Sequence, residues 1–287
     1  MPQRALFAVS LLLFLGACAQ TPQRAQAPPA ARAGESQVTQ IQRLADILPV
    51  LDANGGRRTL LVLDIDDTLL TSQVFFGSDR WYEWQKSLQP GDAGFVPCKF
   101  DIIGLSYEAG TQRLTEDAAA RDLVNAIAGD KLLLTARNPG YRGGTIRELR
   151  AAGYTLPDTL GTDRDGVLFD WRPTPGAAPV PISYQDGVMM VTGRDKGETL
   201  LAMLQLQSLD YDRVVLVDDG RRNIDQMQAA LARAGIDYHG LWYTHVDKTI
   251  APADVSAGQA GWTALRTWLA GTFPERLRRM EAGQCFY

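Results

Sequence analysis

The residues of this chain best suited to chemistry follow directly after an apolar run. The run TLLVL, residues 59–63, leads into Asp64, Asp66 and Asp67. Because Asp64 and Asp66 are two positions apart, their side chains should leave an extended backbone on the same side, whereas Asp67 should point away. Two carboxylates on one side can divide the work of a nucleophile and a proton-transfer group.

Other polar residues stand in comparable places. Thr135 ends a second apolar run, Asp218 and Asp219 end another, and Lys196 opens a helical pattern after a further one. Taken singly, an aspartate or threonine in such a place is more often a helix cap or a turn residue than a catalytic residue, and a lysine there is more often solvated. The carboxyl ends of parallel strands meet at one edge of a sheet, where ligands bind. The coincidence of all of them therefore favours a common site.

Carboxylates gathered at one rim repel each other and tend to need a cation. The chain has two histidines and three cysteines, and it has no CxxC, so a site built from nitrogen or sulfur ligands is not expected. Oxygen ligands suit a hard ion such as Mg²⁺.

The elements that must position these residues alternate along the chain. Short runs rich in Val and Leu, without polar alternation, indicate strands covered on both faces, as in a parallel sheet. They are residues 59–65, 131–136, 186–192, 213–219 and 238–244, with helical patterns at 37–52, 114–129, 143–153, 196–207 and 220–235. This alternation predicts an α/β fold with a doubly wound, mostly parallel sheet.

Two stretches interrupt the alternation. Residues from about 70 to 113 are long enough for a small insertion over the sheet, and the prolines in residues 153–185 favour irregular or hairpin structure. Within the insertion, Trp81 and Trp84 lie three apart, on one face of a helix. They either pack the insertion onto the core or stack on a flat leaving group of a bound substrate.

The N-terminus has the features of an export signal. Residues 1–17 hold Arg4 and an apolar stretch that is too short to span a bilayer. The signal ends in LGAC, which resembles a bacterial lipobox and implies lipidation of Cys18; the alternative is an ordinary signal peptide with Cys18 incidental. Residues 18–37, rich in Ala, Gln and Pro, predict a flexible tether, and residues 38–287 the catalytic domain.

Export also bears on the remaining cysteines. In an oxidising compartment Cys98 and Cys285 could form a disulfide, although the sequence leaves this pairing open. The formal net charge is -4 and no basic stripe is present, so a nucleic acid polymer is not an expected partner.

Four segments together resemble the motifs of the haloacid dehalogenase (HAD) superfamily, in order. They are DIDDT from Asp64, LLLTAR from Leu132, RDKGETL from Arg194 and VLVDD from Val215. The resemblance implies helices on both faces of the sheet and a small cap at the insertion after the first strand. It implies that Asp64 attacks phosphorus, that Asp66 acts as acid and base, that Thr135 hydrogen-bonds the phosphoryl group and that Lys196 neutralises it.

The resemblance also implies a ligand set for Mg²⁺: the Asp64 carboxylate, the Asp66 backbone carbonyl and Asp218. Asp219 would be a further ligand, oriented by Asn223, unless either is only a helix cap. Arg137 could reach the substrate or could be solvated.

The function that this resemblance implies is Mg²⁺-dependent hydrolysis of a small phosphomonoester. The lipobox and the insertion are similar to those of lipid-anchored acid phosphatases and nucleotidases of the superfamily. Residues 186–204 and 240–245 resemble a poorly characterised group of envelope proteins with a HAD-like fold. The lipobox implies a lipid anchor in the outer membrane, facing the periplasm. Two alternatives remain, a non-catalytic envelope binding module and a phosphotransferase that uses an acceptor alcohol; the sequence leaves the oligomeric state open.

Overall fold

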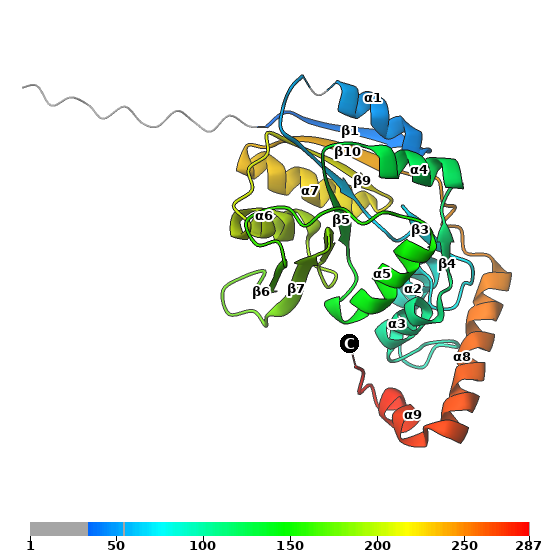
Figure 1. Ribbon diagram of the computed structural model, residues 1–287. Helices are drawn as coiled ribbons and strands as arrows, with labels where there is room; N and C mark the ends of the chain where they lie inside the picture. Colours follow the sequence, from blue (N-terminus) through cyan, green and yellow to red (C-terminus); the bar gives the residue numbers. More distant parts are fainter. Residues whose placement is uncertain (1–33, 54, 287) are drawn as a thin grey trace, which may run out of the picture. The chain divides into compact units, whose positions relative to one another are not determined.

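A computed structural model describes residues 34–53 and 55–286 of the chain (Figure 1). The predicted signal peptide, Cys18 and the first part of the predicted tether lie outside the described residues, so they stay predictions. Among the residues that are described, none of the helices combines the length and the apolar character that a membrane span requires.

The centre of the fold is an eight-stranded sheet, in the spatial order β1-β10-β9-β2-β5-β8-β7-β6. The strands from β1 to β8 in this order pair in parallel, and the last two, β7 and β6, add on antiparallel. Their bounds are β1 Ser36–Ile41, β2 Thr59–Leu63, β5 Asp130–Thr135, β6 Val167–Trp171, β7 Val180–Gln185, β8 Val188–Met190, β9 Arg213–Asp218 and β10 Asp237–Tyr243.

Helices cover both faces of this sheet because successive strand residues point to opposite sides. In β2, Leu60 and Val62 belong to the core on one face, and Leu61 and Leu63 to the core on the other. The first face is covered by α6 (Lys196–Leu206) and α7 (Arg221–Ala234). The second is covered by η1 (Leu44–Asp46), α1 (Ile47–Asp52), α4 (Ala118–Ala126), η2 (Pro139–Tyr141) and α5 (Arg142–Ala151). The predicted doubly wound α/β fold is confirmed.

The beginning of the domain differs from the sequence prediction. Residues 38–41 were expected to be helical and residues 36–37 to be tether, but Ser36–Ile41 form an edge strand that pairs in parallel with β10. Helical structure begins only at Leu44. Apolar spacing over so few residues does not separate a strand from a helix, and here pairing with a distant strand decides the conformation.

The insertion after β2 forms a small separate layer, and we call residues 70–114 the cap. Its base is an antiparallel ribbon of β3 (Leu70–Ser72) and β4 (Gln112–Leu114). Between them lie α2 (Asp79–Ser87) and α3 (Lys99–Ala109).

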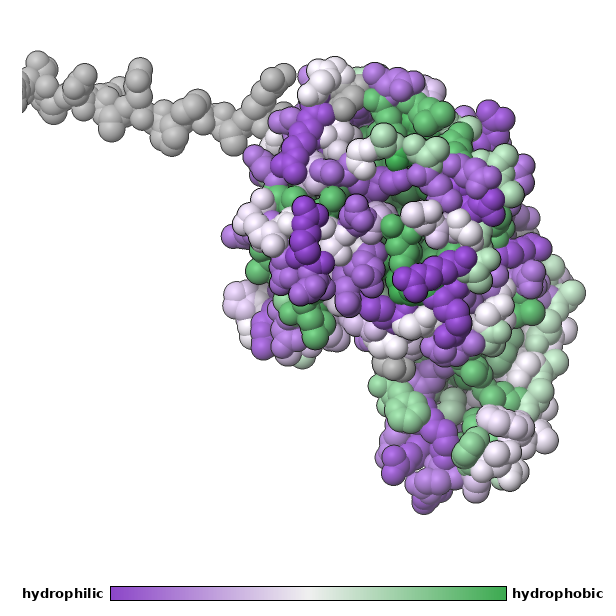
Figure 2. Space-filling view, viewed as in Figure 1, coloured by the Kyte–Doolittle hydropathy of each residue, from purple (hydrophilic) through white to green (hydrophobic). Residues whose placement is uncertain are grey.

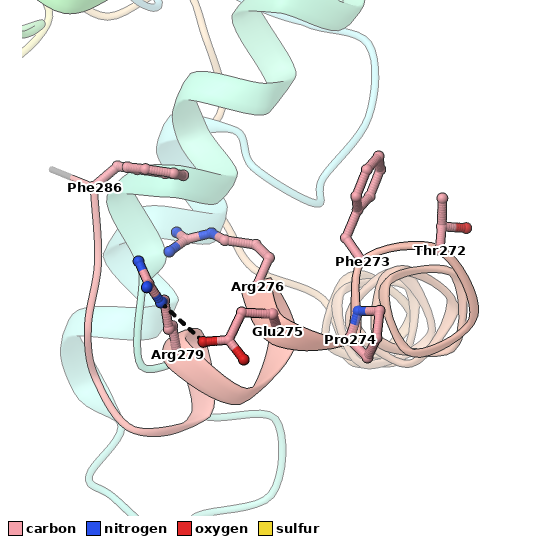
Figure 3. Close-up of a pocket in the computed structure, with 7 residues that line it drawn as sticks. All are labelled: Thr272, Phe273, Pro274, Glu275, Arg276, Arg279 and Phe286. Carbon is pink, nitrogen blue, oxygen red and sulfur yellow. Dashed lines mark hydrogen bonds and ion pairs between the residues drawn. The ribbon is translucent and has the colours of Figure 1, made fainter.

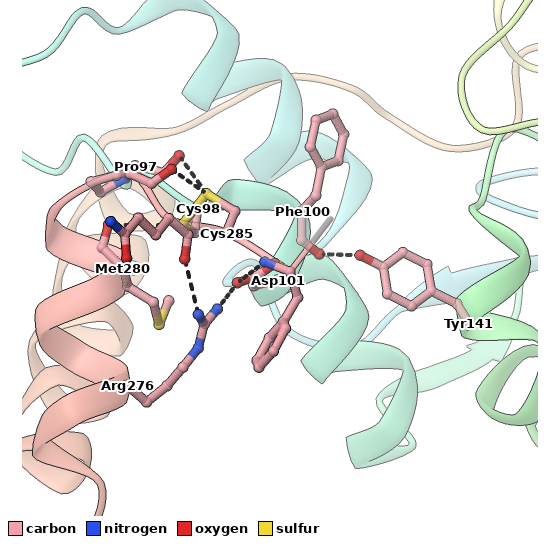
Figure 4. Close-up of a disulfide and its surroundings, with 11 residues drawn as sticks. Pro97, Cys98, Phe100, Asp101, Tyr141, Arg276, Met280 and Cys285 are labelled. Carbon is pink, nitrogen blue, oxygen red and sulfur yellow. Dashed lines mark hydrogen bonds and ion pairs between the residues drawn. A yellow bond between two sulfur atoms is a disulfide. The ribbon is translucent and has the colours of Figure 1, made fainter. Parts of the chain in front are cut away.

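The C-terminal segment packs on the cap rather than on the sheet. The helices α8 (Pro252–Thr272) and α9 (Pro274–Glu281) share a third hydrophobic cluster with α2 and α3. Apolar residues also lie along α8 at the lower right of Figure 2. A disulfide joins Cys98, at the start of α3, to Cys285 beyond α9 (Figure 4). The cap is therefore tied covalently to the C-terminal segment.

Candidate active site

A cavity of about 720 Å³ lies at the carboxyl ends of the central strands. Its floor includes Asp64, Lys196 and Asp219 from the sheet side, and its cap wall includes Tyr82 and Phe100. Of the polar residues predicted to share one rim, Asp64, Asp66, Lys196 and Asp219 line this cavity, whereas Thr135 and Asp218 are buried beneath its wall.

Asp64 and Asp218 lie side by side because their strands are neighbours. Leu63 of β2 is opposite Val217 of β9, and the Asp64 N–H donates to the Val217 carbonyl at 2.9 Å. Both carboxylates are buried. Parallel pairing thus brings together two acidic residues that are far apart in sequence.

A tight turn after β2 holds the rest of the first motif. Three successive N–H groups, those of residues 68, 69 and 70, donate to the Ile65 carbonyl, and Asp67 has a φ of 54°. The buried Thr68 hydroxyl donates to Asp64 Oδ2 at 3.4 Å and accepts from the Asp219 N–H at 3.2 Å. Thr68 therefore fixes two of the acidic residues relative to each other.

Lys196 lies between the two neighbouring carboxylates. Its ammonium donates to Asp64 Oδ1 at 2.6 Å and to Asp218 Oδ2 at 2.7 Å. Burial lowers the pKa of Lys196, but the charges of Asp218 and Asp64 outweigh this effect and raise the pKa above its ordinary value. Lys196 is therefore a fixed, protonated cation at the floor of the cavity.

The acidic residues exceed what the lysine can neutralise. One carboxylate oxygen from each of Asp64, Asp218 and Asp219 lies within 4.8 Å of the others. Burial raises the pKa of Asp64, with Lys196 opposing, and burial raises the pKa of Asp219 to about 7, with Lys248 opposing. An oxygen-only donor set with surplus negative charge fits a hard divalent cation such as Mg²⁺.

Asn223 orients a different aspartate from the one predicted. Its side-chain amide donates to Asp218 Oδ1 at 2.9 Å, and the Gly220 N–H donates to the same oxygen at 2.8 Å. The expectation that Asn223 orients Asp219 is wrong, because the first turn of α7 points the amide back at the end of β9. Asp218 is thus fixed by two donors on one oxygen and by Lys196 on the other.

Arg137 contacts Asp66 rather than solvent. Its guanidinium donates to Asp66 Oδ1 at 2.7 Å and to Oδ2 at 3.0 Å, and it lies 3.6 Å from the centre of the Tyr107 ring. Burial raises the pKa of Asp66, but the charge and hydrogen bonds of Arg137 dominate and lower it. The pair fixes the orientation of Asp66 and favours its ionised form.

Thr135 is buried behind this pair. Its hydroxyl donates to Asp66 Oδ2 at 3.4 Å and accepts from the Arg137 N–H at 3.2 Å. Thr135 is not among the described residues that line the cavity, so in this structure its contacts are to Asp66 and Arg137.

Sequence reasoning missed Lys248, which follows β10. Its ammonium donates to Asp79 at 2.8 Å, is ion-paired with Asp219 at 2.7 Å, and also contacts Asp67. The sequence pointed to Lys248 only indirectly, because the acidic residues around the first motif need a cation that the motif itself does not supply.

A comparison with models of protein families shows the family to which the chain belongs. The family model described as "Protein of unknown function (DUF2608)" matches residues 40–275. The chain belongs to this family. No curated protein matches the sequence.

Two solved structures are similar in part. One is titled as the class C acid phosphatase from Bacillus anthracis with tungstate bound. It has 14% sequence identity, covers 76% of this chain and 85% of its own, and gives a TM-score of 0.36. The other, titled as the structure of the class C acid phosphatase from the same organism, has 10% identity, covers 76% and 84%, and gives the same TM-score of 0.36.

The two tryptophans of the cap do not face the cavity. Trp81 has no exposed surface and Trp84 is 9% exposed, and both pack in the cluster shared with α8. The two tryptophans therefore pack inside the protein and do not stack on a substrate. Their prediction as substrate-binding residues is wrong. The cap contributes other aromatic side chains, since Tyr82 and Phe100 line the cavity with ring centres 5.7 Å apart.

A second cavity, of about 540 Å³, lies where α8 meets α9 (Figure 3). Its charged side chains are paired: Arg279 with Glu275, and Arg276 with Asp101. None of the residues predicted to act in chemistry lines it.

Proposed function

We propose that this protein hydrolyses small phosphomonoesters with the help of Mg²⁺, through an aspartyl-phosphate formed on Asp64. One observation carries the proposal: Lys196 bridges Asp64 and Asp218, and Asp219 completes a group of three carboxylates within 4.8 Å, of which Asp64 and Asp219 line the cavity. Such a constellation combines a nucleophile with fixed positive charge, which transfer of a phosphoryl group requires.

Asp66 is ionised before the substrate binds and takes up the acidic proton of the phosphomonoester monoanion. In the first step Asp64 forms a bond to phosphorus as the bond to the leaving oxygen breaks, and Asp66 passes this proton to that oxygen. In the second step the ionised Asp66 removes a proton from water, the water oxygen bonds to phosphorus, the bond to Asp64 breaks, and the proton leaves with the phosphate product. The ionised Asp66 that Arg137 stabilises is the form required in this second step.

The cations of the site make this attack feasible. Lys196 neutralises phosphoryl oxygens next to the carboxylate that attacks. Asp64, Asp218 and Asp219 would hold Mg²⁺, which when bound supplies further positive charge at the same oxygens.

We further propose that the protein acts in the cell envelope, anchored by lipid on Cys18 at the periplasmic face of the outer membrane. The support is the LGAC sequence after an apolar export signal. A disulfide between Cys98 and Cys285 is also consistent with an oxidising compartment.

The test is an assay of wild type and Asp64→Asn with an aryl phosphate and Mg²⁺. We expect the substitution to lower kcat by roughly a thousandfold or more, because the amide cannot attack phosphorus. The chain from residue 32 onward is suitable, since it forms a compact unit and retains β1.

Asp165→Asn is the matched control, because Asp165 is an exposed aspartate in a turn before β6. It should retain wild-type turnover. Equal turnover by Asp64→Asn and wild type would exclude the covalent mechanism, and full activity after chelation would exclude Mg²⁺. Product analysis with added alcohols separates hydrolysis from phosphotransfer, and a wild-type protein without turnover on any phosphate ester would favour the binding module.

A further inference from the structure

The charges that line the active-site cavity are almost all paired. Five carboxylates and six cationic side chains belong to its wall. Every one of these carboxylates, and four of the cations, takes part in an ion pair. The two other cations, Arg194 and Arg222, have no ion pair and no side-chain hydrogen bond within the described part of the chain, and both are exposed.

The two arginines come from neighbouring elements. Arg194 lies in the loop before α6, two residues before Lys196, and Arg222 lies in the first turn of α7, three residues after Asp219. The first turn of α6 packs against the second turn of α7, because a Cβ on Gly197 would be 2.9 Å from the Cα of Met227 and 3.1 Å from the carbonyl oxygen of Gln226. Gln226 lies one turn after Arg222 and lines the cavity with both arginines, so the two arginines come from adjoining elements of the cavity wall.

We propose that Arg194 and Arg222 form a subsite for a second phosphate, so that the substrate is a small phosphomonoester whose leaving group carries another phosphoryl group. This inference rests on the function proposed above. Arginine binds phosphate oxygens through two parallel N–H groups, and an arginine without a carboxylate partner is available for such binding. The paired cations of the cavity, by contrast, are already engaged.

The cap wall offers a surface for the body of such a substrate. Tyr82 and Phe100 lie in the wall near each other. Burial raises the pKa of Tyr82, and the charge of Arg222 acts in the opposite direction, which places Arg222 within electrostatic reach of this side chain. A substrate held by Asp64 at one end could therefore contact Tyr82 and Arg222 beyond it.

The test compares two substrates with the same scissile bond, phenyl phosphate and para-(phosphonomethyl)phenyl phosphate, on the full-length protein. We expect the wild type to prefer the phosphonate-bearing substrate in kcat/KM by about tenfold or more at low ionic strength, with the preference falling as salt is added. In Arg194→Gln/Arg222→Gln the preference should fall to about twofold or less. Arg221→Gln is the matched control, since Arg221 lies in the same turn but is paired with Asp225, and it should retain the wild-type ratio.

A binding measurement keeps this proposal separate from the proposed reaction. Calorimetry with para-xylylene diphosphonate and with benzylphosphonate requires no turnover. Tighter binding of the diphosphonate by wild type, lost in the double variant, would support the subsite even if no ester were hydrolysed. Equal affinity for the two ligands in wild type, or a preference that the double variant retains, would overturn it.

Discussion

At the scale of single residues, Glu148 is the least expected titratable group near the site. It lies buried behind Arg137, with Oε2 at 3.7 Å from the guanidinium. Among the described residues Oε2 has no hydrogen-bond donor, whereas Oε1 accepts from the Gln112 N–H at 3.3 Å. Burial raises the pKa of Glu148 from 4.5 to about 7, although the charge of Arg137 opposes this shift. Arg137 is thus shared unequally, with hydrogen bonds of 2.7 and 3.0 Å to Asp66 and a longer ion pair of 3.7 Å to Glu148.

This shift predicts a dependence of stability on pH. Between about pH 4.5 and 7 the folded protein keeps a proton on Glu148 that the unfolded chain releases, so the free energy of unfolding should fall as the pH rises through this window. Glu148→Gln removes that contribution. When the pH is raised from 4.5 to 8, the free energy of unfolding of the variant should therefore rise by roughly 1 to 3 kcal/mol relative to that of wild type. Urea denaturation at both pH values measures the difference.

Glu108→Gln is the control, because Glu108 forms an exposed pair with Arg147 of the same helix α5 that carries Glu148. Its stability relative to wild type should change little with pH. If the free energy of unfolding of Glu148→Gln changed with pH in parallel with that of wild type, Glu148 would not titrate in this window.

The sequence predicted that Asp64, Asp218 and Lys196 share one edge of the sheet, and the structure brings their side chains into contact. Asp64 and Asp218 meet because parallel strands carry their ends to one edge, and Lys196 opens the helix that begins there. Their roles in a reaction stay predictions. The partners Arg137 and Lys248 could not be assigned, since their contacts with Asp66 and Asp67 join positions 71 and 181 residues apart. Local patterns contain no information on such pairs.

At the scale of elements, Lys248 connects the cap to the sheet. Asp79 is the first residue of α2 in the cap, and Asp219 directly follows the central strand β9. The ammonium of Lys248 is ion-paired with both. Lys248→Met should lower the free energy of unfolding by about 1 to 2 kcal/mol, because it leaves the buried Asp67 and the half-buried Asp219 without their cation, although Lys248 itself is partly exposed to solvent. Chemical denaturation measures this loss, and hydrogen exchange should show faster opening of α2.

Lys86→Met offers the comparison, since Lys86 is on α2 but pairs only at the surface with Glu83. Its effect should stay below about 1 kcal/mol. Similar losses in the two variants would mean that Lys248 is an ordinary surface lysine.

The elements that sequence patterns missed depend on partners remote in the chain. β1 is a strand because β10 offers an edge to it, and α8 is fixed by apolar contacts with the cap through Trp262 and Leu269. The strands β2, β5 and β9 were predictable because they are buried on both faces and need no alternation.

At the scale of the whole described domain, the disulfide closes a long loop. Cys98 and Cys285 are 187 positions apart, so the bond restricts the unfolded chain strongly. Cys285→Ser should lower the free energy of unfolding by about 3 to 5 kcal/mol. Reductant should lower the Tm of wild type to that of the variant and leave the Tm of Cys285→Ser unchanged; an equal decrease in both would point to an effect of the reductant elsewhere.

The disulfide also bears on how substrates reach the cavity. The chain enters and leaves the cap through the paired strands β3 and β4, Lys248 joins the cap to the end of β9, and Cys98 fastens the cap to the C-terminal segment. The disulfide makes the cap and the C-terminal helices one larger unit, and a unit of this size held at its paired crossings and by Lys248 is poorly suited to swing aside as a hinged lid. We therefore expect molecules to enter by diffusion through a permanent opening, so that turnover does not wait for a gate.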